Sequence, residues 1–242
     1  NSPEEFWIEI FEKKCLFSAG ELLFTNKDLI WFEKLLWAHE SIIPDQVDVN
    51  KQGKSSSYNR IKLGKDPFAW LMDCYRDGAT IIFNGLDDID PEVADVVRPL
   101  DKIFKGKTTA NAFLTPPKSR GFMPHFDTHD VFIVQLAGEK MWHLYKQEME
   151  LPLDNQIYLI DQEKLAEPSQ SYVLQPGNVL YIPRGYIHGA HTEESYSLHL
   201  TIGIRPLLGI DYLESMLEVL SKENPDLRKS LINDYEDTAS VR

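Results

Sequence analysis

The segment from residue 108 to residue 204 constrains the fold most, because it is a series of short strand-like stretches separated by turn residues. Gly138, Pro176-Gly177 and Pro183-Arg184-Gly185 mark the turns. Many short strands with regular turns favour a double-sheet jelly roll. The expected strands cover residues 109–114, 130–136, 140–145, 171–174, 178–182 and 196–204.

Helical patterns lie on both sides of this region. We also expect a buried strand over 80–84, a polar surface loop over 45–63 and an insert on the barrel rim over 147–170. We interpret the acidic run that ends at Asp90 as a solvent-exposed helix cap. The expected helices cover 3–13 (capped by Ser2), 26–39 (capped by Asn26), 67–77 (ended by Gly78), 91–104 (capped by Asp90) and 226–235. Another helix is expected after Pro206, with an apolar stripe of Ile210, Leu213, Leu217 and Leu220 and an end at Asn224-Pro225.

Length and composition favour one large domain with helical additions, since the chain has 242 residues of which 43% are hydrophobic. We divide it into a mixed N-terminal part (1–107), a β core (108–205) and a C-terminal helical segment (206–242). Cys15 and Cys74 are far apart, in segments with a helical pattern, and we expect both to be reduced thiols. We therefore expect a cytoplasmic protein.

The net charge of −13 argues against direct nucleic-acid binding, which requires clustered Lys and Arg. An acidic surface could attract a basic protein partner, although solubility alone explains it equally well. No apolar run approaches the roughly 20 residues that a membrane helix needs. The N-terminus also lacks the basic and apolar pattern of a signal peptide.

One short motif, His125-Phe126-Asp127, points to a metal centre. Residues i and i+2 of an extended segment face the same side, so His125 and Asp127 can direct an imidazole and a carboxylate at one point. Two histidines and one carboxylate form the facial triad of non-haem Fe(II) sites. His188, after the Pro183-Arg184-Gly185 turn, is the best third ligand, with His129 and His191 as rivals.

The residues around these positions resemble the JmjC-type cupin dioxygenases, and are most similar to the ribosomal oxygenases. The resemblance covers roughly residues 3–205 and is densest from 111 to 201. The matching segments are His125-Phe126-Asp127, Asp130-Val131-Phe132, Gln135-Leu136-Ala137-Gly138-Glu139-Lys140-Met141-Trp142, Pro176-Gly177-Asn178-Val179-Leu180-Tyr181-Ile182-Pro183-Arg184-Gly185 and His188.

This resemblance implies Fe(II) held by His125, Asp127 and His188, with 2-oxoglutarate as co-substrate and O2 as oxidant. Lys140, fifteen residues after His125, matches the basic residue that the family uses for the far carboxylate of 2-oxoglutarate. The resemblance also places Asn111 near the metal and co-substrate, and the Thr201 hydroxyl at the same carboxylate.

Other histidines are assigned from the residues alone. His199 shares a strand face with Thr201, so it can also line the pocket. His143 lies on the opposite strand face from Lys140, and His39 lies in a helix. We expect both to be structural.

The resemblance implies an enzyme that hydroxylates a side chain of a protein substrate, with a ribosomal protein as the first candidate. Alternatives remain open: a hydroxylase of a peptide natural product or small molecule, histone demethylation as a weaker third, or a non-catalytic metal-binding cupin. The resemblance also implies a homodimer formed through the C-terminal helices. The alternative is a helix pair that packs on its own barrel, and we prefer the dimer.

Overall fold

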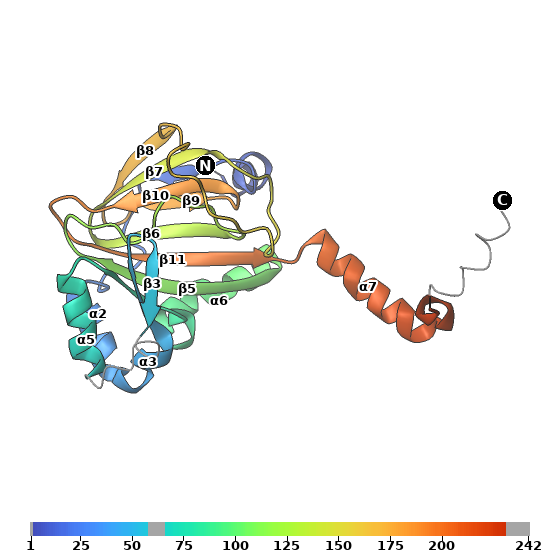
Figure 1. Cartoon of the computed structure of the whole chain (residues 1–242), viewed down its shortest axis with the longest axis horizontal. Coiled ribbons are helices and arrows are strands. Elements are labelled where there is room, and N and C mark those ends of the chain that lie inside the picture. Colours follow the sequence, from blue (N-terminus) through green and yellow to red (C-terminus); the bar gives the residue numbers. More distant parts are fainter. Residues whose placement is uncertain (1, 58–65, 231–242) are drawn as a thin grey trace.

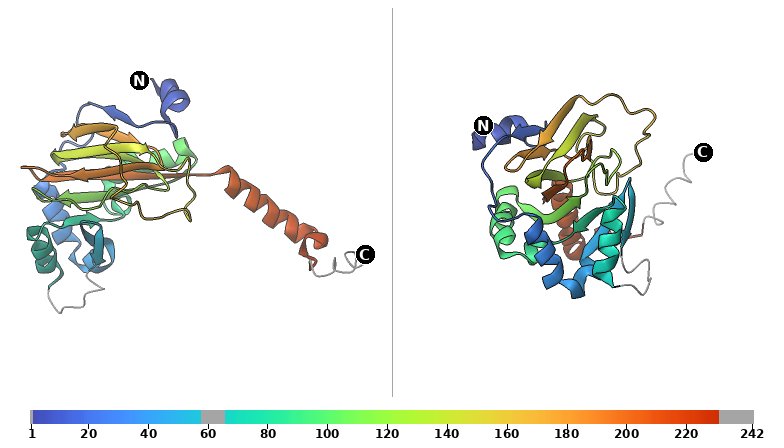
Figure 2. Two further views of the ribbon diagram at one scale, coloured as in Figure 1. Left: turned by 45° about the horizontal axis from the view of Figure 1, so that its top comes forward. Right: turned by 90° about the vertical axis from the view of Figure 1, so that its left-hand side faces the viewer.

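The computed structural model describes residues 2–57 and 66–230, and its centre is a two-sheeted β structure (Figure 1 and Figure 2). The larger sheet has the order β1-β9-β6-β11-β5-β4-β2-β3 and the smaller one β10-β7-β8, and all neighbouring strands are antiparallel. This confirms the predicted jelly roll. The strands are β1 (Leu16–Ser18), β2 (Val47–Lys51), β3 (Lys54–Ser57), β4 (Thr80–Phe83), β5 (Gly106–Thr115), β6 (Asp130–Gly138), β7 (Lys140–Gln147), β8 (Gln170–Leu174), β9 (Val179–Ile182), β10 (Tyr186–His191) and β11 (Ser197–Pro206).

Helices cover the outer face of the larger sheet, and one further helix projects from the body (Figure 1). Proline begins several of them, as its fixed φ and missing N–H favour the first helical turn. The α-helices are α1 (Pro3–Glu5), α2 (Leu29–Ala38), α3 (Ile43–Gln46), α5 (Pro67–Arg76), α6 (Pro91–Phe104) and α7 (Gly209–Glu223). A π-helical turn spans Phe6–Ile10, and 3-10 turns span Glu40–Ile42, Leu86–Asp88 and Pro225–Arg228.

Alternation along β6 shows how the larger sheet separates two hydrophobic clusters. Val131 and Ile133 pack with Trp142 between the two sheets. Val134 and Leu136 point to the other side, into the cluster that the helices cover. Because both faces of this strand are buried, its sequence is almost continuously apolar.

The predicted surface loop at 45–63 is wrong in its described part, where the chain forms the β2–β3 hairpin. Val47 and Val49 alternate into the core, which ties β2 to β4. The hairpin turns at Gln52 and Gly53, with φ angles of 52° and 81°, as a two-residue turn of the primed type requires. Residues 58–63 of the predicted loop lie outside the described residues.

Several boundaries also differ from the predictions. The helix predicted over 26–39 begins at Leu29, because the Asp28 carboxylate and not Asn26 accepts the Trp31 N–H at 2.9 Å. The first helix ends at Ile10. Cys15 precedes β1 and lies outside a helix, while the predictions missed β1 and β10 entirely. No disulfide joins the two cysteines.

The helix after the barrel, α7, stands apart from its own body (Figure 1), which contradicts packing on the barrel. None of its described side chains is buried. It ends at Glu223, as the Asn224-Pro225 pair predicts. The helix predicted over 226–235 is a single 3-10 turn through Arg228, and residues 231–235 lie outside the described residues.

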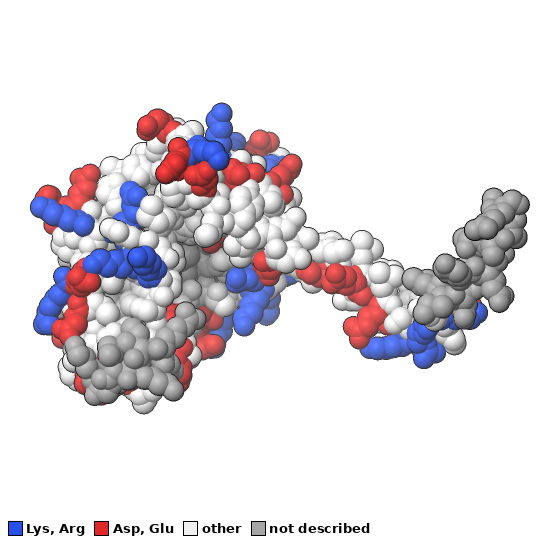
Figure 3. Space-filling model, viewed as in Figure 1, with Lys and Arg blue, Asp and Glu red and all other residues white. Residues whose placement is uncertain are grey.

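Charge is distributed over the surface in both signs. On the face shown in Figure 3, basic and acidic side chains are interspersed on the body, while α7 carries acidic side chains along its length. Among the described residues, no helix is both long and apolar enough to cross a membrane.

The acidic cap of α6 is buried, contrary to the prediction. Asp90 caps the Glu92 and Val93 N–H groups as expected, at 3.0 and 3.1 Å. Its other oxygen binds the Lys27 ammonium at 2.6 Å and the Trp31 indole N–H at 3.0 Å. Asp90 therefore joins α6 to the N-terminal segment as well as capping it.

We predict that Asp90→Ala lowers the free energy of unfolding by about 2–4 kcal/mol, because it removes the α6 cap and the buried partner of Lys27, which keeps only the half-exposed Glu92 carboxylate at 3.0 Å. Asp77→Ala is the matched control, since it removes an exposed pair with Lys51 and should cost under about 1 kcal/mol. Denaturant unfolding measures both. Equal effects of the two substitutions would contradict the structural role of Asp90.

Candidate active site

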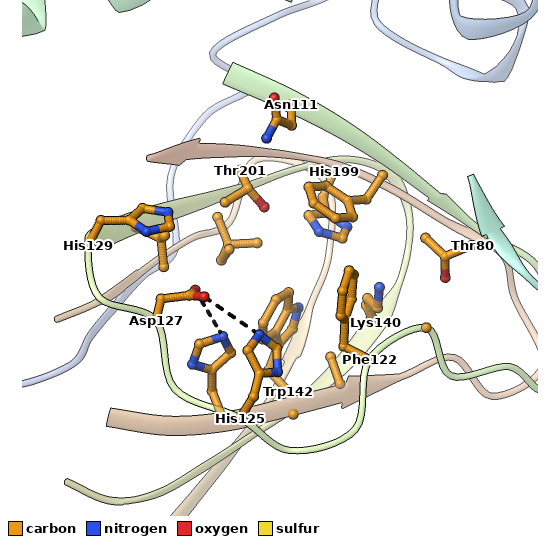
Figure 4. A pocket seen from close by; sticks show the side chains of 17 residues that line it. Thr80, Asn111, Phe122, His125, Asp127, His129, Lys140, Trp142, His199 and Thr201 are labelled. Carbon is orange, nitrogen blue, oxygen red and sulfur yellow. Dashed lines mark ion pairs between the residues drawn. The ribbon is translucent and has the colours of Figure 1, made fainter. Parts of the chain in front are cut away.

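A cavity of about 200 Å³ lies between the two sheets and contains every side chain that the sequence assigned to the site (Figure 4). Its walls come from β4, β5, β6, β7, β10, β11 and the segment between β5 and β6. The residues used below are Asn111, Phe113, Phe122, His125, Asp127, His129, Lys140, Trp142, His188, His199 and Thr201.

His125, Asp127 and His188 converge at one side of this cavity, and Figure 4 labels the first two. The His125 Nε2 atom is 3.7 Å from one Asp127 carboxylate oxygen, and the His188 Nε2 atom is 3.5 Å from the other. One ligand atom from each of the three residues lies within 4.8 Å of the other two. In the described residues, this is the only such group of three, and its donors suit a divalent transition metal.

Backbone pairing places the two histidines opposite each other. The His125 N–H donates to the His188 carbonyl at 3.0 Å, and the His188 N–H donates back at 2.8 Å. The Gly185 N–H also donates to the Asp127 carbonyl at 2.9 Å. The turn before β10 is thus tied to the His-x-Asp segment at two points, which explains how residues 63 positions apart reach one site.

Each imidazole is also held in a tautomer that suits metal binding. The His125 Nδ1–H donates to the Met123 carbonyl at 2.8 Å, and the His188 Nδ1–H donates to the Tyr186 carbonyl at 3.0 Å. With Nδ1 protonated, each Nε2 lone pair is free to bind an ion. A backbone acceptor on the distal nitrogen is the usual support for a metal-binding histidine.

Electrostatics favour the forms that bind a metal. Burial, together with the nearby His125, lowers the pKa of His188 to about 4, so its imidazole is neutral at neutral pH. Burial opposes ionisation of Asp127, but attraction to His125 and His188 lowers its pKa overall. The site therefore presents an anionic carboxylate and a neutral imidazole.

Lys140 lies in the cavity on the first residue of β7 and shares a strand face with Trp142, as predicted. Its ammonium donates to the Thr115 hydroxyl at 2.9 Å. Among the described residues no carboxylate forms an ion pair with it. Burial lowers the pKa of Lys140 to about 7. A buried cation without a counter-ion is a suitable partner for an anionic ligand.

Asn111, Thr201 and His199 also line the cavity, where the sequence placed them. Asn111 and Thr201 are direct neighbours across β5 and β11. The Asn111 side-chain oxygen accepts the Gly85 N–H at 3.0 Å, which also gives it a structural role. His199 is fully buried against Phe113, with ring centroids 5.1 Å apart.

The rival ligands occupy different places. His191 is not among the residues that line the cavity, and it stacks on His143 at a centroid distance of 5.2 Å. His129 lines the cavity near Asp127, but its Nδ1 atom accepts from the Arg205 guanidinium at 3.4 Å. His39 lies at the end of α2, outside the site.

The hydroxyl groups that hold Lys140 were missed by the sequence predictions. Thr115 binds Lys140, and Thr80 in turn contacts the Thr115 hydroxyl at 3.0 Å. The signal was present, because Asn111, Phe113 and Thr115 alternate onto one face of β5. This alternation, extended to the end of β5, predicts Thr115. No local pattern points to Thr80, because it lies on β4.

Comparisons with known proteins agree with this geometry. The JmjC domain is matched over residues 92–211. The chain is 30% identical to ribosomal oxygenase 1 of Rattus norvegicus over 97% of its length, but covers only 41% of that protein. It is 38% identical over 68% of its length to the bifunctional lysine-specific demethylase and histidyl-hydroxylase NO66 of Drosophila persimilis, of which it covers 24%. The chain thus spans less than half the length of these relatives.

Solved structures show the same fold. The E. coli protein ycfD aligns with a TM-score of 0.61 and 17% identity, over 92% of this chain and 58% of that one. A second neighbour is the structure of YcfD, a ribosomal oxygenase from Escherichia coli, in complex with cobalt and 2-oxoglutarate. It aligns with a TM-score of 0.57 and 17% identity, over 91% of this chain and 56% of that one.

We predict that Lys140→Met stabilises the ligand-free protein by about 1–4 kcal/mol, because it replaces a buried cation with an apolar side chain of similar length. The pKa of Lys140 is lower in the folded than in the unfolded state. The penalty of burying its charge is therefore complete below pH 7 and fades as the pH rises towards the unfolded pKa of about 10.4.

Calorimetric melting at pH 6 and pH 9 measures this effect, and the gain should be larger at pH 6. Lys146→Met, at an exposed position of the same strand, is the control and should change little. A Lys140→Met protein that is less stable at pH 6 would contradict the account of this residue.

Proposed function

This chain is a JmjC-domain protein similar to the ribosomal oxygenases, and we propose that it is an Fe(II)- and 2-oxoglutarate-dependent dioxygenase that hydroxylates a side chain of a protein substrate. One observation carries the proposal. The facial set His125, Asp127 and His188 shares a buried cavity with the cation of Lys140 (Figure 4). A metal-chelating dicarboxylate is the class of ligand that both features fit.

The relatives support this assignment. Similar proteins are named ribosomal oxygenase and histidyl-hydroxylase, and a structural neighbour was solved with cobalt and 2-oxoglutarate. Because the chain covers less than half of the two curated relatives, a histidine of a ribosomal protein is a proposed substrate that only their names suggest. The reaction that we propose converts 2-oxoglutarate, O2 and a substrate C–H group into succinate, CO2 and an alcohol.

Each residue has a distinct part in this proposal. His125, Asp127 and His188 would hold the iron, which would supply the oxygen-activating chemistry. Lys140 would neutralise the far carboxylate of 2-oxoglutarate, aided by the Thr201 hydroxyl. Asn111 would orient the co-substrate from β5. Phe122 and Trp142 provide the apolar walls that keep water from the reacting groups.

The size and exposure of the site indicate how a protein substrate would enter. The side chains of His125 and Asp127 are 38% and 28% exposed, so the metal position can be reached from outside. The cavity of about 200 Å³ is of a size that suits small groups such as a co-substrate and one side chain. We propose that a single side chain of a larger protein enters, with a histidine of a ribosomal protein as the first candidate.

We predict that Asp127→Ala reduces succinate formation from 2-oxoglutarate by at least about 100-fold, since it removes the anionic ligand of the metal. Asp161→Ala, at an exposed position, is the control and should retain activity. Succinate is measured in the purified, iron-supplemented protein. Unchanged turnover in Asp127→Ala would show that the metal site is elsewhere.

Mass spectrometry of cellular proteins identifies the substrate class. Cells with the active protein should contain one residue with an added oxygen that is absent from cells with Asp127→Ala. Loss of a methyl group from lysine would instead indicate demethylation. Absence of any protein change, with 2-oxoglutarate still consumed, would favour a peptide natural product or small molecule.

The projecting helix α7 supports a homodimer as a further part of the proposal. Leu213 and Leu217 are 55% and 60% exposed, although they belong to one apolar stripe. Amphipathic helices of 15 residues are marginal unless the apolar face is covered. A second copy of α7 presents the same stripe and would cover it symmetrically.

We predict that the chain of 27.9 kDa elutes with about twice that molar mass in light scattering. Leu213→Glu combined with Leu217→Glu should give the monomer mass, because it places charges in the contact. Ser215→Glu, on the same helix, is the control and should remain dimeric. A monomeric parent protein at micromolar concentration would contradict the dimer.

A further inference from the structure

The residues just before β1 contact the turn that joins β9 to β10. Strand β1 pairs antiparallel with β9, and this register brings the preceding residues alongside the turn that follows β9. The Glu12 carboxylate accepts the Arg184 Nη2–H at 2.7 Å, and the Lys13 carbonyl accepts the Tyr186 hydroxyl at 2.7 Å. Two adjacent residues near the N-terminus therefore bind on both sides of Gly185.

The ion pair between Glu12 and Arg184 is largely shielded from water. The Arg184 side chain is 7% exposed and that of Glu12 is 28% exposed. Among residues 2–57 and 66–230, Glu12 is the only carboxylate that forms an ion pair with Arg184. A buried guanidinium is unfavourable without such a partner, so the pair determines where the Arg184 side chain lies.

The backbone of Glu12 is held in an uncommon conformation. Its φ angle is 57°, in the left-handed region that few residues other than glycine adopt. Its N–H donates to the Tyr181 hydroxyl at 2.9 Å, and Tyr181 donates to the Asp130 carboxylate at 2.6 Å. Such conformations persist where surrounding contacts compensate for them, and they are concentrated at functional sites.

The turn that contains Arg184 also contacts the proposed metal centre. The Gly185 N–H donates to the Asp127 carbonyl at 2.9 Å, and His188 follows three residues later, in a reciprocal backbone pair with His125. A displacement of this turn would therefore shift the backbone of two proposed metal ligands together. The β pairing brings these ligands to one place, and the ion pair limits how far the turn between them can move.

We propose that Glu12 and Arg184 are positioning residues for the metal centre, because their ion pair holds the turn at 183–185 and, through it, Asp127 and His188. This inference rests on the proposed function. Neither Glu12 nor Arg184 lines the cavity, so both act through the turn and not on the metal or the substrate. Groups that orient metal ligands in this way typically change metal affinity by about 10–100-fold when they are removed.

Isothermal titration of the metal-free protein with Co(II) tests this inference. Arg184→Met removes the guanidinium and leaves Glu12 partly accessible to water, so no buried charge remains unpaired. It should weaken Co(II) binding about tenfold. Arg184→Lys restores a cation beside Glu12 and should recover part of the affinity. Arg76→Met, which removes an exposed ion pair with Asp73, is the matched control and should bind Co(II) as the parent does.

Variants of Glu12 separate positioning from folding. Glu12→Gly removes the carboxylate and supplies the residue that a φ of 57° favours, so its effect on stability is limited. It should weaken Co(II) binding as much as Arg184→Met does. The double variant should show no further loss, because the two residues act as one pair. Asp90→Ala, which weakens the fold at α6, should leave the Co(II) affinity unchanged.

The remaining outcomes overturn the inference. Parent-like Co(II) binding in Arg184→Met and Glu12→Gly would show that the turn needs no ion pair, while leaving the proposed function intact. Additive losses in the double variant would show that the two residues do not act together. A similar loss in Asp90→Ala would attribute the effect to general instability. A parent protein that does not bind Co(II) would refute the proposed function and this inference together.

Discussion

The site depends on the two reciprocal backbone hydrogen bonds between His125 and His188, at 3.0 and 2.8 Å. This pair joins a segment before β6 to the start of β10, across the two sheets. It fixes the distance between the imidazoles, and the carbonyls of the same segments fix their tautomers. Because side chains alternate along an extended segment, Asp127 faces the same side as His125 and can reach both imidazoles. The convergence of these three side chains is thus a consequence of β pairing.

The cavity beside it is organised for a ligand at the expense of stability. Lys140 is buried without an ion-pair partner in the described structure, and Trp142 and His199 have unpaired polar atoms. Each feature would be unfavourable in a purely structural core. The buried Lys140 cation is explained if an anionic ligand completes the set. The polar interior is therefore evidence for a bound ligand that is independent of the metal ligands. It argues against a cupin with only a structural metal.

Much of the fold followed from the sequence, because most of the strands and helices have strong periodic patterns and marked turns. The helix caps at Ser2 and Asp90 were identified correctly, as were the limits of α6. The β2–β3 hairpin was missed because its Gln52-Gly53 turn lacks the usual Asn-Gly signal and its strands are polar on one face. The burial of Asp90 was missed because its partner Lys27 lies 63 residues away and no local pattern links them.

The resemblance placed the metal ligands and Lys140 in one cavity, whereas the partners of Lys140 depend on contacts between strands that only the structure shows.

The central claim is that His125, Asp127 and His188 hold an iron that 2-oxoglutarate chelates. The most direct measurement is the visible absorption spectrum of the Fe(II) protein under anaerobic conditions. We expect 2-oxoglutarate to produce a charge-transfer band in the parent protein, which reports chelation through the 2-oxo group. The absence of such a band at saturating 2-oxoglutarate would contradict the account.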